Sequence, residues 1–280
     1  MVAEQWRGVG FGVIIHALRF GVIVGALWIA PLVGITGWYM GLFANGLCGL
    51  YAAVLITHYR LWNTIGIRRL WHGRTAALFL LVPLAESLAW ILPNGLAFVP
   101  PGFGLWALTL ALVGFNEELI SRGLVLHRLR QSFGTFPAVI LTGALFGLQH
   151  LSLFATSDRG TYDIVTNMLM SGTVGFAFAA FQYRFSWIWP LIILHAFADF
   201  TAIWARSPHG DLFAAGTAVI FVAYGVVVLR TVPVPRFGAA NDTEIEPPSA
   251  GGSRSGPGTA GGSDPMTVNG TSGKADQLQE

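Results

Sequence analysis

"FGLWALTLALVGFNEELISRGLVL", residues 103–126, decides the class of this protein. The stretch opens on a long run of apolar and small residues, places two carboxylates and an arginine next, and then turns apolar again. About 20 predominantly apolar residues, wound as a helix, cross the hydrocarbon core of a bilayer. A charge at the centre of such a helix costs roughly 3 kcal/mol on insertion scales, so the acidic pair needs a physical reason.

The composition of the whole chain agrees with a membrane location. Of its 280 residues, 54% are hydrophobic and only 11% are charged, whereas soluble domains carry about 25% charged residues. The net charge of +2 is small, and no basic run with interleaved aromatic residues is present. We therefore expect an integral protein of the lipid bilayer and no nucleic-acid partner.

Apolar stretches of similar length recur along the chain and predict about eight membrane spans. The expected fold is therefore all-α, a polytopic membrane helix bundle of about eight transmembrane helices within a domain covering 1–238. The expected spans are roughly 9–31, 36–57, 76–93, 103–126, 136–155, 164–183, 187–205 and 211–230.

Arginine is distributed unevenly over the connections between these spans. With the N-terminus inside, the outer connections hold only Arg159 and Arg206. The inner connections and ends hold Arg7, Arg60, Arg68, Arg69, Arg74, Arg128, Arg130, Arg184, Arg230 and Arg236. Positive charge collects on the cytoplasmic side, so we expect a protein of the plasma membrane with both termini in the cytoplasm.

Residues 239–280 have a different composition, rich in Gly, Ser, Pro, Asp and Glu and poor in large apolar residues. Such a segment cannot bury enough apolar surface to offset the entropy lost on folding. It is predicted to be a disordered cytoplasmic tail.

The two acidic residues at 117 and 118 can have different roles. Glu118 and Arg122 are four residues apart, so on a helix they face the same side and can form an ion pair. Glu117 is rotated from Glu118 by about 100°. The spacing predicts that Arg122 holds Glu118 and that Glu117 stays free for chemistry.

Two later spans also carry ionisable side chains. Phe146 and His150 share a helix face in "FGLQH", and His195 and Asp199 share one in "HAFAD". Ionisable residues at membrane depth mark functional sites by default. By contrast, His16 and Arg19 in the first span are expected to extend toward the inner surface and receive no role; Glu86 is also left out of the site.

Three motifs together carry a family resemblance. "EELISR" fits E-E-x-x-x-R, "FGLQH" fits F-x-x-x-H, and "HAFAD" fits H-x-x-x-[N/D], in this order on successive spans. The chain thereby resembles the CAAX-protease and bacteriocin-processing (CPBP, or Abi) family of intramembrane proteases over about residues 76–205.

The resemblance implies an intramembrane endopeptidase acting on a membrane-associated peptide or protein substrate. It implies that Glu117, helped by His150, activates the attacking water, that Glu118 and Arg122 support them, and that His195 and Asp199 stabilise the oxyanion. Eukaryotic CAAX proteases have Asn in place of Asp199. A carboxylate donates a hydrogen bond only when protonated, so Asp199 is either neutral, or orients His195, or helps to hold a cation.

Several alternatives stay open at the level of sequence. Histidine with carboxylate is a ligand set that zinc accepts, so zinc is a possible cofactor with Glu117, His150, His195 and Asp199 as candidate ligands. H-E-x-x-H and G-x-S-x-G are absent from the sequence. An ion- or proton-coupled transporter, or a catalytically inactive membrane scaffold, would use the same buried charges differently.

Overall fold

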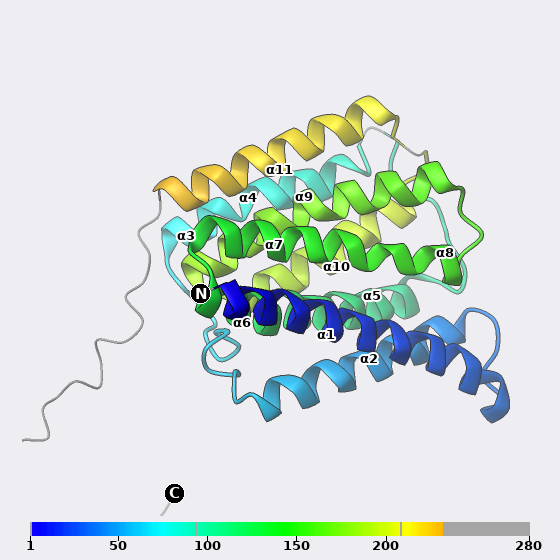
Figure 1. The fold of residues 1–280 in the computed structure, drawn as a ribbon. Coiled ribbons are helices and arrows are strands. Elements are labelled where there is room, and N and C mark those ends of the chain that lie inside the picture. The colour runs from blue at the N-terminus through cyan, green and yellow to red at the C-terminus, as the bar shows by residue number, and fades with distance from the viewer. Residues whose placement is uncertain (1, 93, 208, 232–280) are drawn as a thin grey trace, which may run out of the picture. The chain divides into compact units, whose positions relative to one another are not determined.

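A computed structural model of the chain describes residues 2–92, 94–207 and 209–231. Its described part is a bundle of helices (Figure 1), which confirms the predicted all-α class. Arg236 and the predicted tail, 239–280, lie outside the described residues.

The helices follow one another as α1 (Val2–Ile29), the 3₁₀ turn η1 (Ala30–Val33), α2 (Tyr39–His58), α3 (Arg74–Phe79), α4 (Leu81–Ala89), α5 (Phe103–Glu118), the π-helix η2 (Leu119–Val125), α6 (Leu126–Ser132), α7 (Thr135–Leu148), the 3₁₀ turn η3 (Gln149–Ser152), α8 (Leu153–Thr156), α9 (Thr161–Phe185), α10 (Ile188–Trp204) and α11 (Asp211–Thr231).

Among the described residues, six helical segments are long and apolar enough to cross a membrane. They are Val2–Val33, Tyr39–His58, Phe103–Ser132, Thr135–Thr156, Thr161–Phe185 and Asp211–Thr231. The apolar helix α10, which corresponds to the expected span 187–205, is shorter than these.

The expected span 76–93 differs most from the structure, because it is divided into the short helices α3 and α4 on either side of Leu80. Pro83 lies in the first turn of α4 and has no backbone N–H to bond to the preceding turn. Its ring also clashes with the carbonyl four residues earlier, which favours a break at this point.

Neighbouring helices along the chain pack mostly antiparallel (Figure 1). Helix α2 contacts α1 and α5, α10 contacts α5 and α4, and α9 contacts α7 and α11. Helices α7 and α9 approach closely, since a Cβ added at Gly143 would lie 2.7 Å from the backbone nitrogen of Phe176. Small residues allow such close approach between helices in lipid.

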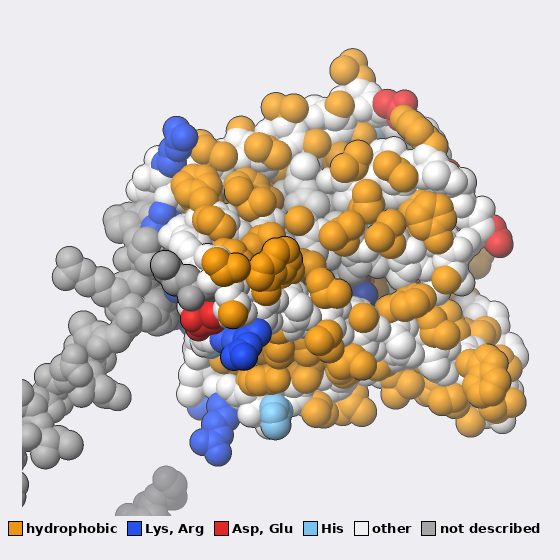
Figure 2. Space-filling model, viewed as in Figure 1, with side chains coloured by type: hydrophobic (Ala, Val, Ile, Leu, Met, Phe, Trp, Pro, Cys, Tyr) orange, Lys and Arg blue, Asp and Glu red, His pale blue; other side chains and the backbone are white. Residues whose placement is uncertain are grey.

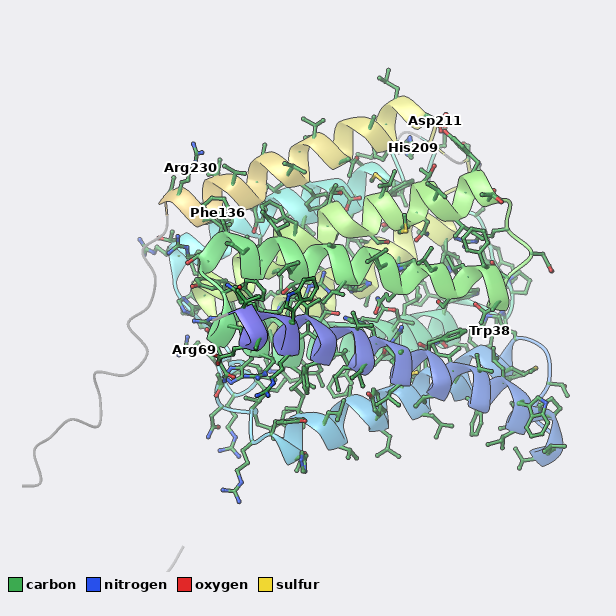
Figure 3. The ribbon with its side chains drawn as sticks, in the orientation of Figure 1. Trp38, Arg69, Phe136, His209, Asp211 and Arg230 are labelled. Carbon is green, nitrogen blue, oxygen red and sulfur yellow. The ribbon has the colours of Figure 1, made fainter. Side chains whose placement is uncertain are left out.

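The outer surface suits a hydrocarbon environment. Figure 2 shows one face covered largely by apolar side chains, with arginine gathered mainly at the end where the chain begins. Large apolar side chains such as Trp28 and Val219 are exposed. Arg69 and Arg230 lie at one end of the bundle, and Trp38 and Asp211 lie at the other (Figure 3).

The arginine-rich connection between α2 and α3 is folded against the turn that joins α9 to α10. Trp187 donates a hydrogen bond of 2.8 Å to the carbonyl of Arg69, and Gln182 donates one of 3.1 Å to the carbonyl of Ile65. Gly66 has a φ of 76°, and a Cβ built there would overlap the carbonyl oxygen of Ser186. Only glycine fits this contact without strain.

We predict that Gly66→Ala destabilises the protein by about 3 kcal/mol, because it adds a clash to the strain of a left-handed backbone. Gly34→Ala is the matched control: Gly34 has a φ of 78° but nothing within 4 Å of an added Cβ. It is expected to cost only about 1 kcal/mol. Thermal unfolding in detergent measures both, and equal losses would show that the Ser186 contact is unimportant.

Candidate active site

The acidic pair lies at the end of α5, where this helix comes close to α10. A Cβ added at Gly114 would lie 2.6 Å from the carbonyl oxygen of Ile192, so glycine sets the short distance between the two helices. Directly after Glu118 the chain winds into the π-helix η2, all of whose residues are buried. Such wide turns are rare in proteins and frequent at functional sites.

Glu118 and Arg122 form the predicted ion pair. Their Oε1 and Nη1 atoms are 3.0 Å apart, and both side chains are fully buried. The same Oε1 lies 2.7 Å from Nδ1 of His195 on α10. Glu118 therefore links two helices, because it binds the guanidinium of its own segment and the imidazole of another.

Phe146 packs these charged groups together. The Arg122 guanidinium lies over its ring, 3.9 Å from the centroid. The imidazoles of His150 and His195 meet the same ring edge to face, at centroid distances of 5.4 and 5.8 Å. The phenylalanine of the F-x-x-x-H motif is therefore an apolar and cation–π support for three charged or polar side chains.

Glu117 is held from a helix to which no role was assigned. Nη2 of Arg19, on α1, lies 2.6 Å from its Oε1, and Nε of Arg19 donates a 2.8 Å hydrogen bond to Oδ1 of Asn116. Gln149 donates a 3.1 Å hydrogen bond to Oε2 of Glu117. The expectation that Glu117 is free was therefore wrong, as was the expectation that Arg19 extends to the surface: only 6% of that residue is exposed.

The second nitrogen of His195 lies near two carboxylates. Nε2 lies 3.7 Å from Oε2 of Glu117 and 3.6 Å from Oδ2 of Asp199. Because the Glu118 carboxylate can only accept when ionised, we place a proton on Nδ1 of His195. The distances around Nε2 are too long for direct hydrogen bonds and suit groups that share a water molecule.

His150 lies beside this cluster but is oriented differently. Its Nδ1 lies 3.0 Å from the carbonyl of Phe146, and its Nε2 lies 3.4 Å from Oγ of Ser171. It interacts electrostatically with Glu117, although the described structure has no hydrogen bond between the two. The structure thus brings all six predicted residues into one region, with His150 at its edge.

Arg19, Asn116 and Gln149 are the site residues that sequence reasoning missed. All three have unusual positions in the sequence. Asn116 and Gln149 directly precede motif residues, and Arg19 is a charged residue inside an apolar span. One signal indicated a second cation such as Arg19. The segment of residues 117–122 carries two glutamates but only one arginine, so one negative charge has no partner within the segment. By contrast, Glu86 accepts a 2.6 Å hydrogen bond from Trp90 and interacts with the cluster electrostatically, through Asp199.

The carboxylates and imidazoles, as they are placed, do not form a metal-ligand set. Within the described residues no group of three or more His, Cys, Asp or Glu is arranged to hold an ion. Glu117 faces the Arg19 guanidinium, and His195 and Glu118 bind each other. A zinc site that includes Glu117 would place the ion beside the Arg19 guanidinium, which like-charge repulsion disfavours.

Comparison with known families finds a match over part of the chain. Residues 99–201 match the family model described as type II CAAX prenyl endopeptidase Rce1-like. The match includes all three motifs and confirms the resemblance to the CPBP intramembrane proteases, and the family implies a protease; α1 to α4 lie outside the matched segment. No match is found among curated proteins or among solved structures.

We predict that Arg19→Gln destabilises the protein by about 3 kcal/mol, because it leaves the buried Glu117 carboxylate without its cation. Glu117→Gln leaves Arg19 unpaired and should cost a similar amount. The double variant should recover much of the loss, since it buries no uncompensated charge. Thermal unfolding of the four proteins in detergent measures the coupling, and strictly additive losses would contradict a direct pair.

Proposed function

We propose that the Rce1-like domain of this chain hydrolyses a peptide bond of a membrane-associated substrate, with water activated by Glu117. One observation carries this proposal: Oε2 of Glu117 and Nε2 of His195 face each other across 3.7 Å. A general base and an imidazolium donor that can hydrogen-bond the same small group are what acyl hydrolysis requires.

In the proposed reaction, Glu117 accepts a proton from a water molecule as its oxygen attacks the substrate carbonyl carbon. Arg19 and Gln149 fix the carboxylate, with Gln149 bound to the same Oε2 that faces His195. A base held at hydrogen-bond distance typically contributes about 10²–10⁴ in rate.

The tetrahedral oxyanion then needs a positive or hydrogen-bonding partner. We assign this role to Nε2 of His195 in the doubly protonated form of the ring, because a ring with its only proton on Nδ1 has no donor at Nε2. The carboxylates of Glu117, Glu118 and Asp199 around the ring favour this imidazolium. Asp199 lies 3.6 Å from the same Nε2 and orients the imidazole from the open side of the cluster. When the carbon–nitrogen bond breaks, the proton on Glu117 passes to the leaving amine. His150 adds an electrostatic contribution at the edge.

The substrate class is the finer part of the proposal. The matched family is described by its prenyl CAAX activity, and we propose a prenylated or otherwise membrane-anchored peptide that reaches the site from the cytoplasm. We retain the plasma membrane as location, with the arginine-rich end that includes Arg69 and Arg230 facing the cytoplasm.

We predict that Glu117→Gln lowers the rate of peptide cleavage by at least about 100-fold, because an amide cannot accept the proton of water. The control is Glu4→Gln, the same change at an exposed glutamate near the start of α1. It should retain activity within about twofold. The measurement uses proteoliposomes with a farnesylated peptide ending in a CAAX sequence and with the cell's own membrane peptides, read by mass spectrometry.

Equal product profiles for the wild type and Glu117→Gln would contradict the assignment of Glu117 as base. A wild type that cleaves neither kind of substrate would favour the inactive scaffold. Ion-gradient-driven uptake into the same vesicles, lost in Glu117→Gln, would favour the transporter.

We predict that the purified protein cleaves its substrate without a bound metal, because the proposed steps use only side chains and water. Elemental analysis should find less than about 0.1 zinc per chain, and incubation with a chelator should leave the rate unchanged, as expected where no ligand set is formed. Loss of activity on chelation that zinc restores would overturn this part of the proposal.

A further inference from the structure

The imidazole of His150 has a neighbour on α9 to which no role has been assigned. Oγ of Ser171 lies 3.4 Å from Nε2 of His150, and 3.3 Å from Oδ1 of Asn167 one turn earlier on the same helix. All three side chains are partly buried. Neither Ser171 nor Asn167 belongs to any of the three sequence motifs. The contact therefore comes from the packing of α9 against the segment that carries F-x-x-x-H.

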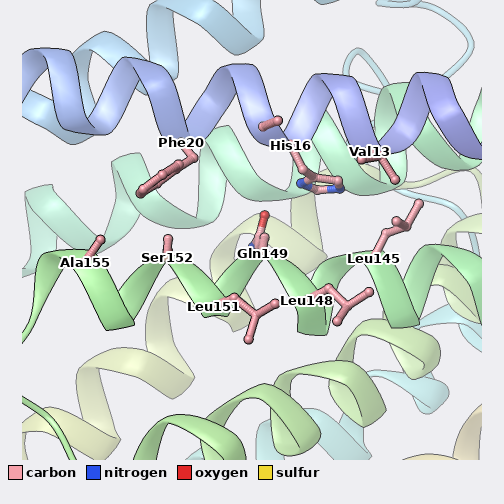
Figure 4. A pocket seen from close by; sticks show the side chains of 10 residues that line it. Val13, His16, Phe20, Leu145, Leu148, Gln149, Leu151, Ser152 and Ala155 are labelled. Carbon is pink, nitrogen blue, oxygen red and sulfur yellow. The ribbon is translucent and has the colours of Figure 1, made fainter. Parts of the chain in front are cut away.

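The direction in which His150 points follows from the turn on which it lies. Figure 4 shows Gln149, the residue before it, extending from η3 toward α1. Successive residues of a 3₁₀ turn are rotated from each other by about 120°. His150 therefore projects in a different direction from Gln149 and meets α9, where Ser171 lies.

Two glycines bring α9 close enough for this contact. A Cβ added at Gly147 would lie 2.7 Å from the carbonyl oxygen of Met168 and 3.0 Å from Cα of Gly172. Small residues at both positions allow the two backbones to approach. Because Gly172 directly follows Ser171, the short serine side chain reaches the imidazole of His150.

The hydrogen bonds of His150 determine its tautomer. Nδ1 lies 3.0 Å from the carbonyl oxygen of Phe146. A carbonyl oxygen can only accept, so Nδ1 carries the proton. In the neutral ring Nε2 is then an acceptor that needs a donor, and the hydroxyl of Ser171 supplies one. No other hydrogen bond to this nitrogen is found among the described residues.

The hydroxyl of Ser171 has one proton and two acceptors within reach. Its distances to His150 and Asn167 are nearly equal, and both are longer than usual for a hydroxyl donor. Such distances are expected when one proton is shared in a three-centre bond. Both acceptors are satisfied only when the O–H points between them, so Asn167 restricts the orientation of the hydroxyl.

The orientation of His150 matters to the rest of the site. Its ring meets the ring of Phe146 edge to face at 5.4 Å, and the same phenylalanine ring supports the Arg122 guanidinium at 3.9 Å. The imidazole also interacts electrostatically with Glu117, the proposed base. Ser171 thus completes a chain of contacts that runs from α9 through His150 and Phe146 to the charged groups.

We propose that Ser171, with its hydroxyl oriented by Asn167, is a positioning residue of the reaction centre: it fixes the tautomer and the ring orientation of His150. A side chain that is locked by such a second contact keeps the groups around it in one geometry. Without Ser171, Nε2 has no donor and the ring is held at one nitrogen only. This inference rests on the proposed function and adds to it a residue of α9, a helix that carries none of the motif residues.

Solid-state NMR tests the tautomer without requiring activity. The full chain is placed in liposomes at mildly alkaline pH with isotope-labelled nitrogens in its histidine rings, and the His150 signals are assigned by their loss in His150→Asn. We expect a protonated Nδ1 and an unprotonated, hydrogen-bonded Nε2. Ser171→Ala should move the Nε2 signal toward the position of a free ring nitrogen. A protonated Nε2 in the wild type, or an unmoved Nε2 signal in Ser171→Ala, would overturn the proposal.

The matched control is Thr173→Val. It also removes a hydroxyl from α9, but Thr173 donates a 2.8 Å hydrogen bond to the carbonyl of Met170 within its own helix. The Nε2 signal of His150 should stay in place in this variant, and a shift as large as in Ser171→Ala would contradict a direct contact.

Kinetics test the effect on the reaction. With the farnesylated CAAX peptide, or another peptide that the wild type cleaves, Ser171→Ala should lower kcat about threefold to tenfold, the equivalent of one lost neutral hydrogen bond. KM should change less than about twofold, because Ser171 acts through His150 and not on substrate binding. Ser171→Thr, which keeps the hydroxyl, and Thr173→Val should both retain a kcat near that of the wild type.

The variants are compared after thermal unfolding has shown equal stability. If the wild type cleaves peptides and Ser171→Ala does so with an unchanged kcat, or with a change confined to KM, this inference fails while the proposed function stands. Equal losses of kcat in Ser171→Ala and Thr173→Val would also contradict it. If the wild type cleaves no peptide, the proposed function fails and this inference with it.

Discussion

The structure depends on the neutralisation of buried charge. Glu117 and Glu118 sit inside an apolar bundle, and each meets one guanidinium, from Arg19 and Arg122 respectively. An isolated charge at membrane depth costs several kcal/mol, and a broken buried pair costs about as much. The Arg19–Glu117 pair joins α1 to α5, and the hydrogen bond of Glu118 with His195 joins α5 to α10.

Both acidic residues are neutralised by an arginine, but their other neighbours differ. Glu118 has no exposed surface and binds His195 as well as its arginine, so its bonds serve to hold two helices together. Glu117 keeps one oxygen directed at Gln149 and near Nε2 of His195. Two carboxylates that are neighbours in the sequence thus differ, because Glu118 is wholly engaged by Arg122 and His195 whereas Glu117 keeps one oxygen beside the imidazole.

Local features were predictable from the sequence and long-range contacts were not. The Glu118–Arg122 pair follows from a spacing of four residues on one helix, and most spans follow from length and composition. The division at Leu80 was missed because a long apolar run predicts one continuous span even when it contains a proline. The Arg19–Glu117 pair joins residues 98 positions apart, and no local pattern specifies such a contact.

This separation along the chain has a consequence for biogenesis. The first helix leaves the ribosome carrying the unpaired cation of Arg19, and α5, which follows much later, carries one acid more than η2 can balance. Insertion of either helix alone into lipid is unfavourable, since each carries an uncompensated charge. We therefore expect the first helix to stay near the insertion site, in contact with water, until α5 is synthesised. The two helices then enter the bilayer together as a neutral pair.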